Sequence, residues 1–107
     1  MTYVVRTLSR AAADAQQIYD WIKENSPEGA LRWWTAFREA SRSLSENPER
    51  QSLAAEAELS DTDIRQLLFK TRRGRHYRLL YVIGHGEVHI LRVRGPGQPD
   101  LTPDELS

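Results

Sequence analysis

The sequence contains no cysteine, and this absence sets the first limits on how the chain can be stabilised. Without thiols there are no disulfides and no thiolate metal sites, so packing must hold the fold together. No apolar run approaches the ~20 residues of a membrane span, and the beginning of the chain lacks the apolar stretch of a signal peptide. We therefore expect a soluble, cytoplasmic protein with no membrane interaction.

Motifs for metals and cofactors are also missing. The three histidines, His76, His85 and His89, do not have a metal-ligand spacing such as His-x-x-x-His on a helix. The chain has no phosphate-binding loop, and the segment Gly84-His85-Gly86 is typical of a hairpin turn. A structural or solvated role is favoured for each histidine. The sequence therefore predicts no metal and no cofactor.

The chain lacks a net charge, but the zero sum conceals an uneven distribution. Residues 1–63 carry seven basic and eleven acidic side chains (−4), residues 64–94 carry eight basic and one acidic (+7), and residues 95–107 carry three acidic (−3). The basic block predicts an anionic partner, either nucleic acid or an acidic protein segment. The alternative is a strand edge kept soluble by charge. Besides Arg78, the residues expected to bind the partner are Arg65, Lys70, Arg72, Arg73, Arg75, Arg92 and Arg94.

The length of 107 residues suits one domain, and we predict a single domain over residues 1–107. Residues 3–8 are rich in β-branched and aromatic types, which favours a strand. Ser9 is a candidate N-cap for a helix over residues 10–25, where apolar residues recur at spacings of three and four.

A second helix is predicted over residues 27–46. Ser26 is its expected N-cap, and Pro27 fits the first helical position, where a missing N–H costs nothing. The inner stripe of this helix is expected to contain Ala30, Trp34, Phe37, Ser41 and Leu44. A short turn between the two helices makes them an antiparallel hairpin.

Three strands are predicted after a polar connection. The strands are Ile64–Thr71, His76–Ile83 and Glu87–Arg94, and their short glycine-bearing connectors indicate an antiparallel meander. The connection, residues 48–63, is expected to contain one helical turn near residues 54–58.

The predicted fold class is α+β with the order β-α-α-β-β-β, and the capping-box pattern of residues 102–105 indicates a final helical turn. The N-terminal helical hairpin should pack on one face of a small antiparallel sheet, because both helices carry an apolar stripe. The other face of the sheet is then expected to be free for function. The side chains expected in the core are Ile18, Ile22, Trp34, Phe37, Leu79 and Tyr81.

Arg78 is the first candidate for a catalytic side chain. It lies mid-strand between apolar residues, where a charge is costly without an anionic partner. That partner is either a ligand or a helix carboxylate such as Asp14 or Asp20. His76 is expected on the same strand face and is the group near Arg78 that could move a proton near pH 7. One face of the last strand is expected to hold Val88, Ile90, Arg92 and Arg94, which would form a cationic rim.

An ordered set of motifs covers nearly the whole chain. A Tyr-x-Val strand is followed by Ala-x-x-Asp-x-x-x-Ile-x-x-x-Ile (residues 11–22), and then by Trp-x-x-Phe within a helix that ends at Leu-x-x-x-Pro (residues 34–48). The strongest match is His-Tyr-Arg-Leu-Leu-Tyr-Val (residues 76–82) with Val-His-Ile-Leu-Arg-Val (residues 88–93). Together these segments resemble the RelE/ParE toxin family of type II toxin–antitoxin systems and plasmid stabilisation proteins.

The resemblance implies a growth-inhibiting toxin that is neutralised by a cognate antitoxin in a hetero-oligomer. ParE-like members inhibit DNA gyrase, whereas RelE-like members cleave messenger RNA on the ribosome with basic side chains and often a late tyrosine. The central RelE arginine falls on Arg78. The family's lysine pair is poorly matched, because only Lys70 lies near it and Arg72 or Arg73 would have to substitute, and no tyrosine follows Tyr81. If the chain cleaves RNA, we expect His76 to carry the proton.

We therefore favour inhibition of a protein target such as gyrase. The alternative is a ribosome-dependent endoribonuclease, and the second alternative is a nontoxic binding module of the same fold. Whether the chain is an enzyme stays open at this point.

Overall fold

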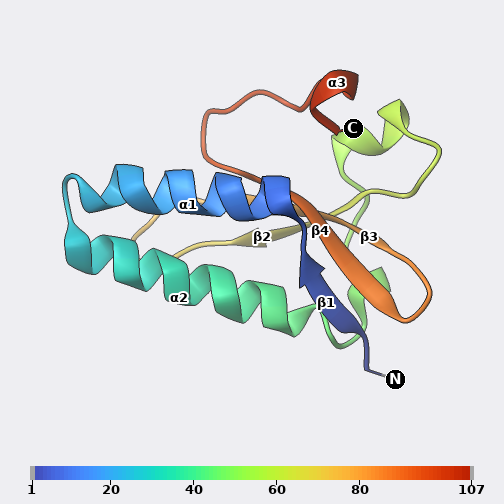
Figure 1. The fold of residues 1–107 in the computed structure, drawn as a ribbon, viewed down its shortest axis with the longest axis horizontal. Coiled ribbons are helices and arrows are strands. Elements are labelled where there is room, and N and C mark those ends of the chain that lie inside the picture. Colours follow the sequence, from blue (N-terminus) through green and yellow to red (C-terminus); the bar gives the residue numbers. More distant parts are fainter. Residues whose placement is uncertain (1, 107) are drawn as a thin grey trace.

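The computed structural model describes residues 2–106, so the two terminal residues of the predicted domain lie outside the described residues. Two long helices follow a first strand, and three further strands follow the helices (Figure 1). The elements are β1 (Val4–Thr7), α1 (Ser9–Lys23), α2 (Pro27–Ser43), η1 (Pro48–Arg50), η2 (Ala55–Leu59), β2 (Arg65–Phe69), β3 (Tyr77–Ile83), β4 (Glu87–Arg94) and α3 (Pro103–Leu106). This order confirms the predicted α+β class, and the predicted turns at η2 and α3 are present.

The four strands form one sheet in the order β1-β4-β3-β2. The pairs β2–β3 and β3–β4 are antiparallel, as expected for a meander. β1 runs parallel to β4, from Val4 opposite Glu87 to Thr7 opposite Ile90, so the sheet is mixed and the prediction of an antiparallel sheet was wrong in this respect. No short turn connects these two strands, so local sequence signals do not reveal their pairing.

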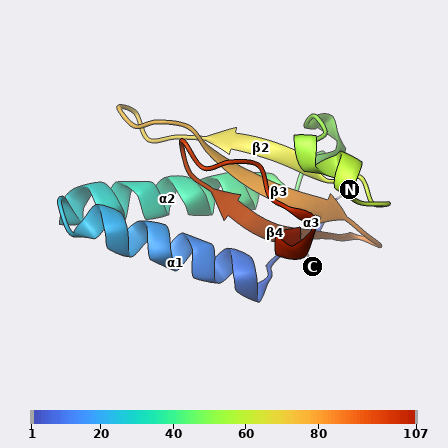
Figure 2. The ribbon, with the colours of Figure 1, turned by 90° about the horizontal axis from the view of Figure 1, so that it is seen from above.

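The helical pair covers one face of the sheet (Figure 2). Phe37, Leu79 and Tyr81 are buried there as predicted, while Ile18 and Ile22 are only partly buried. The full set of buried residues in this core is Ala11, Ala15, Trp33, Phe37, Leu44, Phe69, Leu79, Tyr81, Val88, Ile90 and Val93. No helix between residues 2 and 106 is both long and apolar enough to cross a membrane.

Trp33, and not Trp34, is the tryptophan of α2 that fills the core. Trp33 is 2% exposed and stacks on Phe37, with ring centroids 5.5 Å apart and an interplanar angle of 2°. Trp34 is partly buried and meets Tyr19 of α1 edge-on at 5.6 Å. Because α2 contacts both the sheet and α1, the two neighbouring positions face different partners, which a single helical stripe does not describe.

The two helices begin in different ways. At α2, the N–H of Gly29 donates to Ser26 Oγ at 2.9 Å and Pro27 takes the first position, as predicted. At α1, Ser9 is already helical and Leu8 is the N-cap, without a side-chain cap bond, so the Ser9 prediction was wrong. The helix α2 ends at Ser43, earlier than expected, and the chain then turns through a left-handed residue, Asn47 (φ 49°).

The second face of the sheet is covered, contrary to the expectation that it is free. Ala54, Ile64, Leu80 and Leu101 are buried together there. Ala54 immediately precedes η2, and Leu101 belongs to the tail segment (residues 99–106). The predicted pattern of β4 was also wrong, because a bulge shifts its register with β3 between Leu80 and Tyr81.

As a result of this bulge, Arg92 lies opposite Leu80 and Arg94 opposite Arg78, whereas Val93 lies opposite Leu79. Val88, Ile90 and Val93 belong to the core under the helices. The two arginines therefore do not share a face with Val88 and Ile90, and they stand on the tail side of the sheet with Arg78.

Candidate functional site

The structure divides the predicted basic residues into two groups. Arg65, Arg78, Arg92 and Arg94 are bonded within the protein, and Arg65 Nη1 donates to the carbonyl of Gln51 at 2.6 Å. The second group is exposed at the β2–β3 connection and makes no hydrogen bond or ion pair within residues 2–106; it contains Lys70, Arg72, Arg73 and Arg75.

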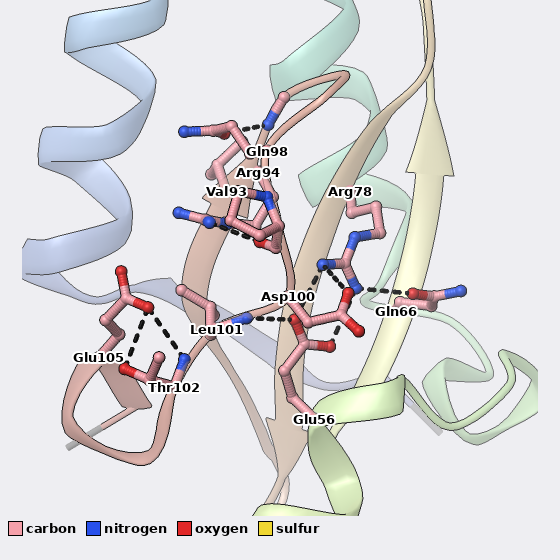
Figure 3. Close-up of polar contacts among 12 residues, drawn as sticks. Glu56, Gln66, Arg78, Val93, Arg94, Gln98, Asp100, Leu101, Thr102 and Glu105 are labelled. Carbon is pink, nitrogen blue, oxygen red and sulfur yellow. Dashed lines mark hydrogen bonds and ion pairs between the residues drawn. The ribbon is translucent and has the colours of Figure 1, made fainter.

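The guanidinium of Arg78 is held by Glu56 of η2. Nη1 donates to Oε1 at 3.0 Å and Nη2 to Oε2 at 2.8 Å, which is the forked geometry of strong arginine–carboxylate pairs. Gln66 of β2 accepts a further bond from Nη1 at 3.1 Å, and Asp100 lies 3.4 Å from Nη2. Figure 3 shows the Glu56 carboxylate between Arg78 and the tail segment.

Glu56 is a buried carboxylate that the sequence analysis did not single out. The residue is 1% exposed, and Oε2 also accepts the N–H of Leu101 at 3.0 Å. Burial raises the pKa of this carboxyl, but the hydrogen bonds from Arg78 and Leu101 and the charge of Arg78 outweigh it and lower the pKa to about 2. The bond to Glu56 in turn raises the pKa of Arg78. The pair is therefore ionised at neutral pH.

Asp14 of α1 binds Arg92 and not Arg78. Its carboxylate accepts from Arg92 Nε at 2.7 Å and Nη2 at 3.0 Å, and it also accepts the N–H of Val93 at 2.9 Å. These contacts form where β4 extends beyond its pairing with β1, which leaves backbone groups of β4 open to α1. Arg92 Nη1 also donates to the carbonyl of Glu105 at 2.8 Å. The pair raises the pKa of Arg92.

Arg94 completes the contacts with the tail segment. It is 7% exposed, and its Nη2 donates to the carbonyl of Pro99 at 2.6 Å. Arg78, Arg92 and Arg94 thus each bond to a residue of the segment 99–106. Figure 3 shows Arg78 and Arg94 beside this segment. The cationic rim expected at the sheet edge stabilises the tail segment.

His76 does not join Arg78. It is exposed, precedes the first residue of β3, and makes no hydrogen bond to Arg78 within the part of the chain that is described. His85 is exposed in the β3–β4 turn, and His89 is bonded to Glu87 at 2.8 Å. Among residues 2–106 no three histidine, cysteine or acidic side chains come together as a metal site.

A groove lies where the α1–α2 turn meets the β2–β3 connection, and both figures place these two turns at the same end of the molecule (Figures 1 and 2). Its volume is about 690 Å³. We call it the tip groove; it is lined by Trp21, Ile22, Ser26, Gly29, Arg32, Trp33, residues 71–75, Tyr77 and Pro96. The groove therefore gathers three of the four free basic residues of the β2–β3 connection beside aromatic rings.

The fold belongs to the class of small α+β proteins in which a helical pair covers one face of a mixed four-stranded sheet. The family model described as "ParE toxin of type II toxin-antitoxin system, parDE" matches residues 5–98. The chain therefore belongs to the ParE toxin family of type II toxin–antitoxin systems.

Two solved structures are similar to the chain. One, from the chromosomal ParDE toxin–antitoxin system of P. aeruginosa, has a TM-score of 0.66 and 22% identity, and the match covers 87% of this chain and 95% of that chain. This likeness shows the fold. The other, from the toxin–antitoxin complex RelBE2 of Mycobacterium tuberculosis, has a TM-score of 0.44 and 28% identity, and covers 88% of this chain and 98% of that chain. No curated protein matches the chain.

Proposed function

We propose that this ParE-type toxin inhibits a protein target such as DNA gyrase and is neutralised by a cognate antitoxin. The observation that carries the proposal is the state of Arg78. Both terminal nitrogens of its guanidinium are bonded to Glu56, at 3.0 and 2.8 Å, so the arginine is already paired with an internal carboxylate.

RNA cleavage requires cations that face the scissile phosphate and a group that moves the proton of the attacking hydroxyl. Arg92 is also paired with a carboxylate, because its Nε and Nη2 both donate to Asp14. A phosphate at either arginine would have to displace its carboxylate and leave that carboxylate without its partner. These contacts favour inhibition by surface binding over a nuclease mechanism centred on Arg78.

The free basic residues support an anionic partner for the toxin. Lys70, Arg72, Arg73 and Arg75 make four positive charges within six residues, and no acidic residue interrupts them. Charge complementarity of this kind mainly raises the association rate. The matching family model describes a toxin of a type II toxin–antitoxin system, which agrees with an antitoxin as one partner of this chain.

The test is induced expression of the chain in a bacterial host, with growth, DNA supercoiling and transcript integrity followed in the same culture. We expect growth arrest with altered supercoiling and intact ribosome-bound transcripts, and we expect co-expression of the antitoxin to restore growth. Purified toxin should inhibit supercoiling of relaxed plasmid by gyrase.

His76→Ala separates the two mechanisms, because the residue is exposed and its replacement does not disturb the core. Under the proposal this variant stays as toxic as the wild type. Cleavage of ribosome-bound transcripts by the wild type, lost in His76→Ala, would establish the endoribonuclease instead. Growth without arrest would leave a nontoxic binding module.

A further inference from the structure

The tip groove combines an apolar surface with free positive charge. Trp21 of α1 lines it and is 65% exposed, an unusual state for a tryptophan, and its ring makes no aromatic contact or hydrogen bond within residues 2–106. A neighbouring hollow of about 440 Å³ shares Trp21, Tyr77 and Pro96 with the groove, so the apolar surface continues along α1. Exposed aromatic residues beside arginines are typical of the centres of protein–protein interfaces.

The indole nitrogen of Trp33 is a second indication that the groove can accept a binding partner. The Trp33 ring lines the groove, and its Nε1 is buried without a hydrogen-bond acceptor within residues 2–106. An unmade hydrogen bond of a buried donor is unfavourable, so such groups are rare in folded proteins. A carbonyl or carboxylate of a bound partner would supply the acceptor after a small shift of the groove wall.

The charges around the groove are not of one sign. Arg72, Arg73 and Arg75 come from the β2–β3 connection and Arg32 from α2, and none of the four makes a hydrogen bond or ion pair among the described residues. Glu28 of α2 is next in sequence to the lining residue Gly29, and Glu24 follows the lining residue Ile22 by two positions. A uniform polyanion such as a nucleic-acid backbone would meet these carboxylates, whereas a protein segment can place its acidic groups on the arginine side alone.

We propose that the tip groove docks an acidic segment of the protein that the toxin inhibits. An apolar side chain of that segment packs against Trp21 and Tyr77, and flanking carboxylates pair with Arg72 and Arg73. The inference rests on the proposed function, since it takes the target to be a protein. The groove opens at one end of a molecule that measures 39 × 31 × 22 Å, so this end can enter a recess of a larger partner.

Two variants remove the two components of the groove. Trp21→Ala removes the apolar surface, and the double variant Arg72→Glu/Arg73→Glu reverses the charge. Because all three side chains are exposed, both variants should keep the fold, which circular dichroism verifies. The matched controls are Leu59→Ala, an exposed apolar residue of η2, and Arg50→Glu, an exposed basic residue of η1; neither lines the groove.

The probe is a synthetic peptide with one central leucine between glutamates, titrated into the purified toxin and followed by NMR. We expect binding that weakens with salt and shifts the amide signals of the groove. Each groove variant should bind roughly tenfold or more weakly, and the controls should bind as the wild type does. Equal binding by all variants, or tighter binding of a single-stranded oligonucleotide that shifts the same signals, would refute the proposal.

Toxicity in cells tests the identity of the occupant. The groove variants should lose growth arrest and still co-purify with the antitoxin. Variants that remain toxic overturn the proposal, and so do variants that lose the antitoxin, since the groove would then be the antitoxin site. A dimer that dissociates in Trp21→Ala would identify a second copy as the occupant. If the wild type causes no arrest, the proposed function fails, and the peptide titration still decides whether the groove binds acidic segments.

Discussion

Replacing Glu56 by glutamine tests whether the Arg78 pair stabilises the fold. Glutamine keeps the size of the side chain but removes its charge and one of its two acceptor oxygens. At least one of the three bonds from Arg78 and Leu101 is therefore lost, and the guanidinium keeps only Gln66 and the exposed Asp100 as its other partners. We therefore expect that the variant folds, and that its tail segment is held less firmly against the sheet.

The expected loss follows from two independent arguments. Removing one partner of a buried ion pair costs about 3–5 kcal/mol, and the remaining bonds and partial exposure of Arg78 reduce this to about 2–3 kcal/mol. The pKa of Glu56 is about 2 in the folded protein. A carboxyl that titrates near ~4.3 when unfolded then contributes roughly 3 kcal/mol at neutral pH. The two values agree.

Urea denaturation monitored by tryptophan fluorescence measures this difference in the free energy of unfolding. Glu58→Gln is the matched control, because Glu58 is exposed in the same turn and should change stability by less than about 0.5 kcal/mol. Equal stabilities of Glu56→Gln and the wild type would refute the role given to the pair. Hydrogen exchange at the amide of Leu101 should also accelerate in the variant, because its acceptor is Glu56.

The same variant predicts a pH dependence. The folded pKa of Glu56 lies below its unfolded value, so its contribution is complete above ~4.3 and is lost as the pH falls toward about 2. The stability difference between wild type and Glu56→Gln should therefore be constant from neutral pH to about pH 5 and roughly halved near pH 3. A difference that grows on acidification would contradict the assignment.

Two further substitutions probe the core under the helices. Phe37→Ala should cost ~3–5 kcal/mol in urea denaturation, because the ring stacks on Trp33 and contacts Phe69 in a closed cluster; a loss below about 1 kcal/mol would mean that the ring is not part of the core. Tyr81→Phe should cost about 1–2 kcal/mol, because the buried hydroxyl donates to the carbonyl of Pro48 at 2.6 Å and its loss leaves that acceptor unpaired. Burial raises the pKa of the Tyr81 phenol to about 12, so Tyr81 should not ionise near pH 10 when the tyrosine absorbance of the wild type is followed at alkaline pH. Ionisation of Tyr81 near pH 10 would contradict its burial.

The local elements of the fold could be predicted because each has a local cause. Ser26 and Pro27 fix the start of α2, and short glycine-bearing connectors fix the β2–β3 and β3–β4 hairpins. The pairing of β1 with β4 could not be predicted, since it joins distant segments without a turn signal. The bulge in β4 was also missed. A strictly alternating pattern assumes that each residue of a strand lies opposite one residue of the neighbouring strand, and a bulge breaks this correspondence.

The candidate site was predicted in part. The sequence identified Arg78 as a charge that needs an anionic partner, and it identified the free cations of the β2–β3 connection. It did not identify Glu56, because this carboxylate lies in an irregular polar segment far from Arg78 in sequence. The tip groove was missed as well, since it combines residues of α1, α2 and the β2–β3 connection that only the tertiary fold brings together.

The Glu56 pair bears directly on how the toxin can act. A phosphate bound by Arg78 would replace the Glu56 carboxylate and leave that buried charge without its guanidinium partner, with the Leu101 N–H as its remaining donor. Breaking such a pair costs ~3–5 kcal/mol, which corresponds to a loss of roughly two to four orders of magnitude in affinity. Arg72 and Arg73 carry no such cost, because they are exposed and have no partner within residues 2–106. Binding energy for an anionic partner is therefore available at the tip of the molecule, and the arginines of the sheet serve to hold the tail segment in place.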